Sequence, residues 1–173
     1  MNRRTLLSAA GLAALAGPLA ACSSDSSSSG SSSSTYSIGI MQILTHSSLD
    51  AAREGFKAAF SDAGITCDFD EENAQGDQTT ATNIATKFAS QNLDLVLAIG
   101  TPAAQAAAQA VTQIPVLFTA VTDPTSAQLV ASADAPGGNV TGTSDMNPVA
   151  EQIGLIKQIK PEAASVGFLY SSG

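Results

Sequence analysis

Short apolar runs alternate with longer helix-favouring runs across residues 36–173. Several of these runs, such as Leu93–Ile99, are nearly continuous, which is typical of parallel strands covered on both faces. The alternation predicts an α/β fold built on an open, doubly wound, mostly parallel sheet. The expected strands are Tyr36–Leu44, Ile65–Asp70, Leu93–Ile99, Ile114–Val121, Asn139–Thr143 and Ser165–Tyr170.

Between the strands, apolar residues recur at the spacing of amphipathic helices. Residues 102–111 are rich in alanine, which favours a helix and allows it to pack closely on a sheet. The other apolar positions that keep helical spacing are Leu49, Ala52, Phe56, Ala59 and Phe60, then Ala81, Ile84, Ala85 and Phe88.

Several expected helices begin with a capping residue followed by proline, a residue that suits the first helical turn. These starts are Thr101-Pro102, Asp123-Pro124 and Asn147-Pro148, and Ser47–Asp50 resembles a capping box. Helices that follow parallel strands should begin at the carboxyl edge of the sheet, where open α/β sheets bind ligands. Free N–H groups there favour an anion, so we expect a small carboxylate-bearing solute, although any single start can serve folding alone.

The N-terminus has the layout of a signal peptide, which we assign to residues 1–21. Basic residues at Arg3 and Arg4 precede an apolar run that is too short and too interrupted for a permanent membrane span. Leu19–Cys22 matches the lipobox of bacterial lipoproteins, so Cys22 is the predicted lipidation site. Further acyl groups on the same cysteine would strengthen the attachment to the membrane. Export by the general or the twin-arginine route remains open.

Residues 22–35 are almost all serine after the cysteine and are predicted to form a flexible tether. The lipid on Cys22 would hold the chain at the outer face of the cell membrane. The full sequence contains seven basic residues, including Arg3 and Arg4, and 15 acidic residues. This acidic balance argues against nucleic acid as a partner.

The residues needed for common chemistries are scarce. With Cys22 lipidated, Cys67 is the remaining thiol and is expected to pack as a small hydrophobe in a strand. His46 is the single histidine, which excludes zinc sites built from several imidazoles. The sequence has no dinucleotide fingerprint, phosphate loop or nucleophile elbow. We therefore expect no enzyme activity, no cofactor and no metal.

Four segments resemble a known family: residues 73–77, 100–106, 115–124 and 136–145, with residues 46–50 similar to its first loop. The family is that of ABC transporter substrate-binding proteins, including tryptophan- and tyrosine-type binders, and the resemblance covers residues 36–173. It implies a type I periplasmic-binding-protein fold, in which two α/β lobes close on a solute. Residues 36–146 would form the N-terminal lobe, and residues 147–173 a crossover helix and the first strand of a second, truncated lobe.

The resemblance implies that an aromatic or hydrophobic amino acid binds and is passed to an ABC permease and ATPase complex. Thr101 and the amides that follow it would receive the carboxylate. Either Asp145 or Asp123 would pair with the ammonium, and Asp145 is the favoured candidate. The full set of expected ligand-binding residues is Thr101, Pro102, Ala103, Thr119, Val121, Thr122, Asp123, Asp145, His46 and Gln75.

Two other functions stay open at this stage. A ligand-sensing lipoprotein would bind the same solute without a role in transport, and a neighbouring permease gene would separate the two. An exported hydrolase or reductase on a flavodoxin-like sheet would show turnover or bound flavin.

Overall fold

The computed structural model describes residues 35–169, so the predicted signal peptide, Cys22 and most of the tether lie outside the described residues. Within residues 35–169, five strands form one sheet in the order β2-β1-β3-β4-β5, and every neighbouring pair is parallel. The predicted open parallel sheet is therefore confirmed. The strands are β1 (Tyr36–Gln42), β2 (Cys67–Asn73), β3 (Leu95–Ile99), β4 (Val116–Val121) and β5 (Val140–Ser144).

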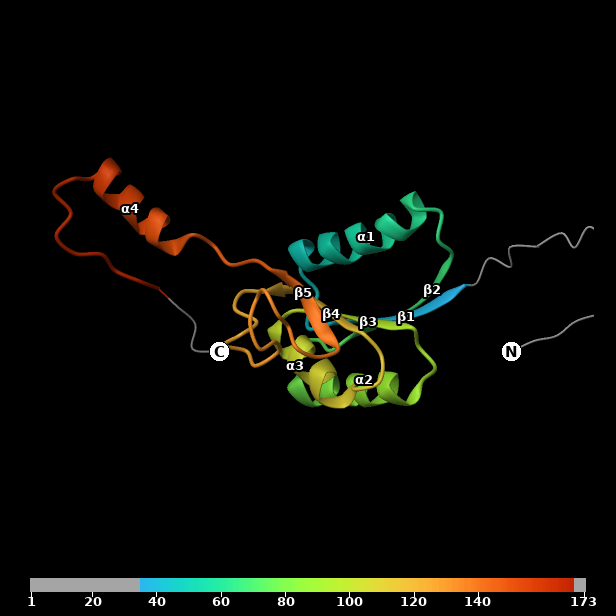
Figure 1. The fold of residues 1–173 in the computed structure, drawn as a ribbon. Coiled ribbons are helices and arrows are strands. Elements are labelled where there is room, and N and C mark those ends of the chain that lie inside the picture. Colours follow the sequence, from blue (N-terminus) through green and yellow to red (C-terminus); the bar gives the residue numbers. More distant parts are fainter. Residues whose placement is uncertain (1–34, 170–173) are drawn as a thin grey trace, which may run out of the picture. The chain divides into compact units, whose positions relative to one another are not determined.

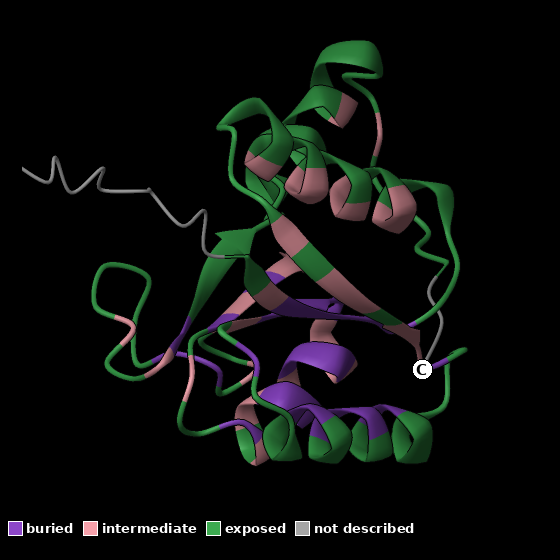
Figure 2. Cartoon of the chain, turned by 90° about the vertical axis from the view of Figure 1, so that its right-hand side faces the viewer, coloured by how far each residue is buried: buried purple, intermediate pink, exposed green. Residues whose placement is uncertain are grey.

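Helices cover both faces of the sheet (Figure 1). Helix α1 (Ser47–Asp62) lies on one face, while α2 (Gln78–Ser90) and α3 (Thr101–Ala110) lie together on the other. The small side chains of α3 let it pack closely, and four of its alanines are buried. Helix α1 has no buried residue, and Figure 2 shows that burial is concentrated in the sheet, α2 and α3. The larger core cluster therefore lies on the side of α2 and α3.

Acidic side chains project from both faces of the edge strand β2. On the α1 face, Glu71 forms ion pairs with Lys57 at 2.5 Å and Arg53 at 3.3 Å. On the α2 face, Lys87 pairs with Asp70 at 2.8 Å and with Glu72 at 2.6 Å. These pairs allow a polar sequence to form a strand, so β2 runs on to Asn73 where a strand ending at Asp70 was expected. Cys67 is half-buried at the start of β2 and packs beside the α1-side core, as expected.

The helix starts differ from the prediction in detail. The cap of α1 is His46, whose Nδ1 accepts the Ser48 N–H at 3.3 Å, so Ser47–Asp50 is not a capping box. The side chain of Asp50 instead accepts a hydrogen bond from Gln42. Helix α2 begins after Asp77, whose carboxylate accepts the Thr80 N–H at 2.6 Å.

The C-terminal part of the described chain departs further from the prediction. Helix α4 (Val149–Ile159) forms, but its cap is Pro148 instead of Asn147. Residues 165–169 form no strand, and Tyr170 lies outside the described residues. A strand is defined by hydrogen bonds to a neighbouring strand, and residues 35–169 supply no such neighbour here.

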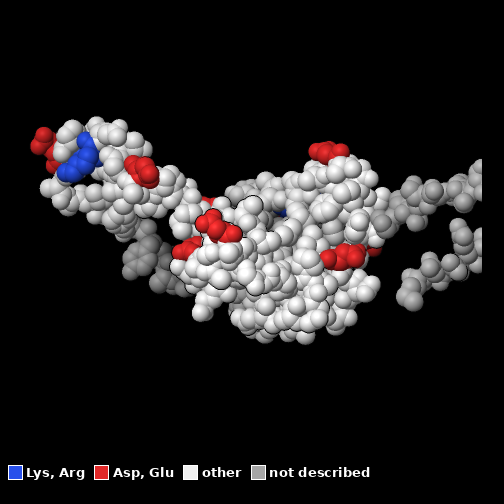
Figure 3. All heavy atoms as spheres, in the orientation of Figure 1, with Lys and Arg blue, Asp and Glu red and all other residues white. Residues whose placement is uncertain are grey.

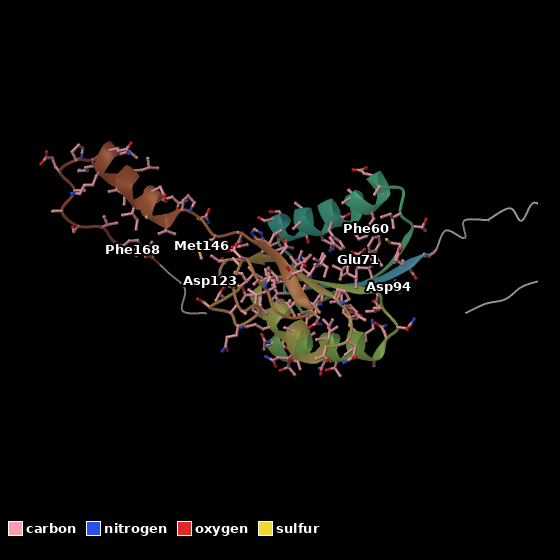
Figure 4. The ribbon with its side chains drawn as sticks, in the orientation of Figure 1. Phe60, Glu71, Asp94, Asp123, Met146 and Phe168 are labelled. Carbon is pink, nitrogen blue, oxygen red and sulfur yellow. The ribbon has the colours of Figure 1, made fainter. Side chains whose placement is uncertain are left out.

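Most apolar residues of this C-terminal part are exposed. Helix α4 has no buried residue. Met146 and Phe168, labelled in Figure 4, are 55% and 71% exposed. The assignment of residues 147–173 to a second lobe remains a prediction. None of the helices within residues 35–169 combines the length and apolar character that a membrane crossing requires.

Candidate functional site

The loops that follow the parallel strands meet at the carboxyl edge of the sheet, where backbone hydrogen bonds join them. From β2 to β5 across the sheet, these bonds run from Gly76 to Ile43 (2.7 Å), Ile43 to Ile99 (3.1 Å), Gly100 to Thr119 (3.0 Å) and Asp145 to Val121 (3.2 Å), donor first. Because these four links connect the ends of all five strands, the edge is one connected surface.

Helix α3 begins at this edge without a side-chain cap. Its N-cap is Gly100, and Thr101, predicted as the cap, is the first helical residue. Pro102 has no N–H, and within residues 35–169 the N–H groups of Thr101 and Ala103 donate to no acceptor. Helices α1 and α2 both have side-chain caps. The start of α3 therefore has the free donors and the positive dipole end that favour an anion.

Two of the predicted binding residues are buried. Ala103 and Val121 have 0% exposure and belong to the larger core cluster, so only their backbone atoms can contribute to a site. The pairing of β4 is irregular between Phe118 and Val121, where Ala120 adopts a φ of 55°. This irregularity turns Val121 into the core and leaves Thr122 exposed just beyond the strand.

Asp123 is already engaged within its own turn. Its carboxylate accepts the hydroxyl of Ser126 at 2.5 Å and the backbone N–H groups of Ser126 at 2.9 Å and Thr125 at 3.1 Å. The Ser126 hydroxyl, followed by the Ser126 N–H, holds the pKa of Asp123 below its usual value. The segment makes a single turn where a helix was predicted, because Leu129 and Val130 leave the helical path to enter the core.

Asp145 differs from Asp123 in having no partner within the described residues. It follows β5 and is exposed, and its carboxylate makes no hydrogen bond or ion pair there. Its backbone N–H donates to Val121 O, and the neighbouring Ser144 hydroxyl donates to Thr122 O at 2.6 Å. The structure thus places Asp145 beside Thr122, with its carboxylate unpaired among residues 35–169.

His46 and Gln75 lie in the two loops at the β1 and β2 end of the edge. Nδ1 of His46 accepts the Ser48 N–H at 3.3 Å. The Gln75 N–H donates to Asn73 Oδ1 at 2.8 Å, and Asn73 Nδ2 donates to Thr45 Oγ1 at 3.1 Å. These bonds tie the two loops to each other, and both predicted side chains are exposed.

A hollow of about 360 Å³ lies between α1 and the sheet, away from the start of α3. Thr119 is the one predicted binding residue that lines it, and its hydroxyl accepts a hydrogen bond from Thr143 at 3.1 Å. The side chain of Thr119 therefore faces α1. The other lining residues are Ala52, Phe56, Leu97, Leu117, Phe118, Thr141, Gly142 and Thr143.

Charged side chains are sparse on the face seen in Figure 3. Basic groups lie mainly over the α4 part, next to acidic ones, and further acidic groups lie scattered over the rest of that face. Among residues 35–169, no cluster of His, Cys, Asp and Glu side chains is arranged to hold a metal ion.

The decisive comparison is with protein families: residues 37–173 match the family described as ABC transporter substrate binding protein. The chain belongs to this family. A relative named "Tyrosine-binding protein", from Clostridioides difficile, is 46% identical over 142 residues, covering 79% of this chain and 41% of the relative. The chain therefore spans less than half the length of that substrate-binding protein.

Two solved structures support the same assignment. A domain from Streptococcus pneumonia, described as an ABC domain in complex with L-Trp, is 39% identical with a TM-score of 0.70, over 74% of this chain and 44% of that one. A conserved domain protein from Vibrio cholerae is 41% identical with a TM-score of 0.71, over 75% and 45%. The sheet and its helices thus match less than half of each of these two longer chains.

Sequence reasoning missed one buried polar residue at this edge. Gln42 ends β1, is 1% exposed and hydrogen bonds to both the following loop and α1. Its signal is a glutamine within the otherwise apolar run from Ile38 to Leu44.

Proposed function

We propose that this chain is the solute-binding part of an exported lipoprotein that delivers an aromatic amino acid to an ABC permease and ATPase. Its family and its relatives, one named for tyrosine and one solved with L-Trp, support this solute class. The proposed role is binding and delivery outside the cytoplasm, without catalysis.

The uncapped start of α3 is the observation that carries the proposal. Thr101 supplies a hydroxyl and an N–H there, and Ala103 supplies a second N–H. A carboxylate held at this point accepts hydrogen bonds from groups that otherwise lack a partner, and the helix dipole stabilises its charge. We assign the carboxylate of the amino acid to this position.

Asp145 is the better partner for the ammonium group of the solute. The carboxylate of Asp123 is occupied by Ser126 and Thr125, whereas that of Asp145 is free among the described residues. Thr122 lies beside Asp145 at the same edge, since its carbonyl accepts the hydroxyl of the neighbouring Ser144. A solute with both charges would lie along the edge from α3 to β5.

The predicted lipid anchor at Cys22 completes the proposal. Leu19–Cys22 has the lipobox pattern, and residues 23–35 are of a composition that tethers a folded domain at some distance from the membrane. A permease and an ATPase encoded beside this gene would favour delivery over sensing.

The test is a thermal melt of the chain with a panel of amino acids. A solute that binds only the folded state raises the free energy of unfolding, by about 2.7 kcal/mol at a hundredfold excess over Kd, and therefore also raises the melting temperature. Tyrosine, tryptophan and phenylalanine should raise it, while glutamate and lysine should not. A shift with sugars or peptides, and none with amino acids, would refute the proposed solute class.

A further inference from the structure

Gln42 is the one buried polar side chain in the core of the described chain. It lies on the α1 face at the end of β1, where its Nε2 donates to Leu44 O at 2.7 Å and to Asp50 Oδ1 at 2.8 Å. Asp50 belongs to the first turn of α1, and its N–H donates to His46 O at 2.9 Å. One amide group therefore holds both ends of the loop that joins β1 to α1.

The other end of the same amide has no partner. Gln42 Oε1 is buried and accepts no hydrogen bond within residues 35–169. Rotating the amide would not help, because the oxygen would then face two acceptors, Leu44 O and Asp50 Oδ1. An unpaired buried oxygen destabilises a protein, so a methionine of similar length would fill this place at lower cost to the fold.

The presence of glutamine at position 42 is therefore better explained by the two hydrogen bonds of its Nε2 than by a contribution to core stability. Two side chains hydrogen bond to the β1–α1 loop, residues 43–46. Gln42 Nε2 donates to Leu44 O, and Asn73 Nδ2 donates to Thr45 Oγ1. The loop presents His46 at the carboxyl edge, and its Ile43 N–H donates to the carbonyl of Ile99, the last residue of β3. Ile43 also lies against Gly100, the N-cap of α3, so this loop borders the helix start to which we assign the carboxylate.

We propose that Gln42 is a positioning residue, which fixes the β1–α1 loop through Asp50 and so supports solute binding without touching the solute. The inference rests on the proposed function. Removing the amide should lower the affinity for the solute without lowering the stability of the fold, so the two effects can be measured separately.

The experiment compares variants by calorimetric titration with L-tyrosine and L-tryptophan and by thermal melting. Gln42→Met should melt at the same temperature as the parent or higher, yet bind about tenfold more weakly. Asp50→Ala, which removes the acceptor, should lose affinity to a similar extent, and Asp50→Asn, which keeps an acceptor oxygen, should stay within about twofold of the parent.

Asp94→Ala is the matched control. The Asp94 carboxylate accepts the Ser37 N–H at 2.8 Å, and Figure 4 shows Asp94 at the end of the sheet opposite Asp123. This variant removes a hydrogen bond of equal length far from the site, so its affinity should equal that of the parent.

Hydrogen exchange on the solute-free chain gives a second readout. The Ser48 and Asp50 amides should exchange about tenfold faster in Gln42→Met, because the loop loses its anchor. Unchanged affinity and exchange in Gln42→Met, or equal losses in Asp50→Ala and Asp50→Asn, would overturn the inference. If the parent binds no amino acid, the proposed function fails, and the exchange rates still decide whether Gln42 fixes the loop.

Discussion

Gly100 lies so close to Ile43 that a Cβ built at position 100 would be 2.6 Å from Ile43 Cγ2. The same glycine has a φ of 98°, which side chains rarely adopt. Gly100 therefore allows the turn before α3 to lie directly against the end of β1. This contact brings the uncapped helix start beside the β1–α1 loop.

Replacing Gly100 with alanine should destabilise the chain by about 1–3 kcal/mol, because the new methyl group meets Ile43 and the backbone is strained. Urea unfolding followed by circular dichroism measures the loss. Gly55→Ala is the control, since nothing lies within 4 Å of a Cβ at this exposed helical position. It should stabilise the chain by roughly 0.5–1 kcal/mol. Equal effects of the two substitutions would contradict the described turn.

Gly142→Ala should disrupt the pairing of β5 with β4. A Cβ at position 142 would be 2.1 Å from the carbonyl oxygen of Phe118, its partner in the register, so one strand has to move. Faster amide exchange in Val140–Ser144, with β1 and β3 unchanged, is the expected result. Unchanged exchange in β5 would show that the strands are not paired in this register.

The ion pairs of Lys87 should make stability depend on pH at both extremes. The Lys87 hydrogen bond holds the pKa of Asp70 below 3.8, so its contribution is present above that value and is lost as the pH falls through the folded pKa. Hydrogen bonds to Asp70 and then Glu72 raise the pKa of Lys87 above 10.5, so this contribution is lost as the pH rises through the folded pKa.

Lys87→Met should therefore flatten both limbs of the stability profile and cost about 0.5 kcal/mol at neutral pH, a small figure because these side chains are 32–42% exposed. Urea midpoints measured from acid to alkaline pH, with and without high salt, provide the check. A parent and a variant with parallel profiles would show that the pairs contribute nothing.

Cys22→Ser should release the protein from membranes, because it removes the thiol that would carry the lipid. Fractionation of cells that express each form, followed by immunoblotting, measures the distribution. The replacement of a serine in residues 23–34 by alanine is the control and should leave the protein in the membrane fraction. A Cys22→Ser protein that still sediments with membranes would refute the lipid anchor.

The sheet could be predicted from the sequence because its strands are nearly continuous apolar runs separated by helices of regular spacing. The failures fall where tertiary contacts override local signals. Asp123-Pro124 resembles a helix start, yet burial of Leu129 and Val130 draws the chain out of the helix after one turn. Residues 165–169 have strand-like composition but no neighbouring strand among the described residues.

The carboxyl edge and the start of α3 on it were predicted more closely than the surroundings of individual side chains. Capping and proline signals located the start of α3, since such signals are local. The burial of Ala103 and the irregularity at Ala120 depend on the packing of β4. The local sequence pattern does not predict this packing. Gln42 shows the opposite case, in which a polar residue in an apolar strand was visible in the sequence but its two acceptors were not.

Titration of the ¹⁵N-labelled chain with L-tyrosine and L-tryptophan, followed by NMR, tests the central claim most directly. We predict saturable changes in the amide chemical shifts of Thr101, Ala103, Thr122 and Asp145. These changes should become much smaller when the carboxylate of the solute is converted to an amide. Shifts that are absent, or that centre on Phe56 and Thr141 in the hollow beneath α1, would contradict a solute site at the carboxyl edge.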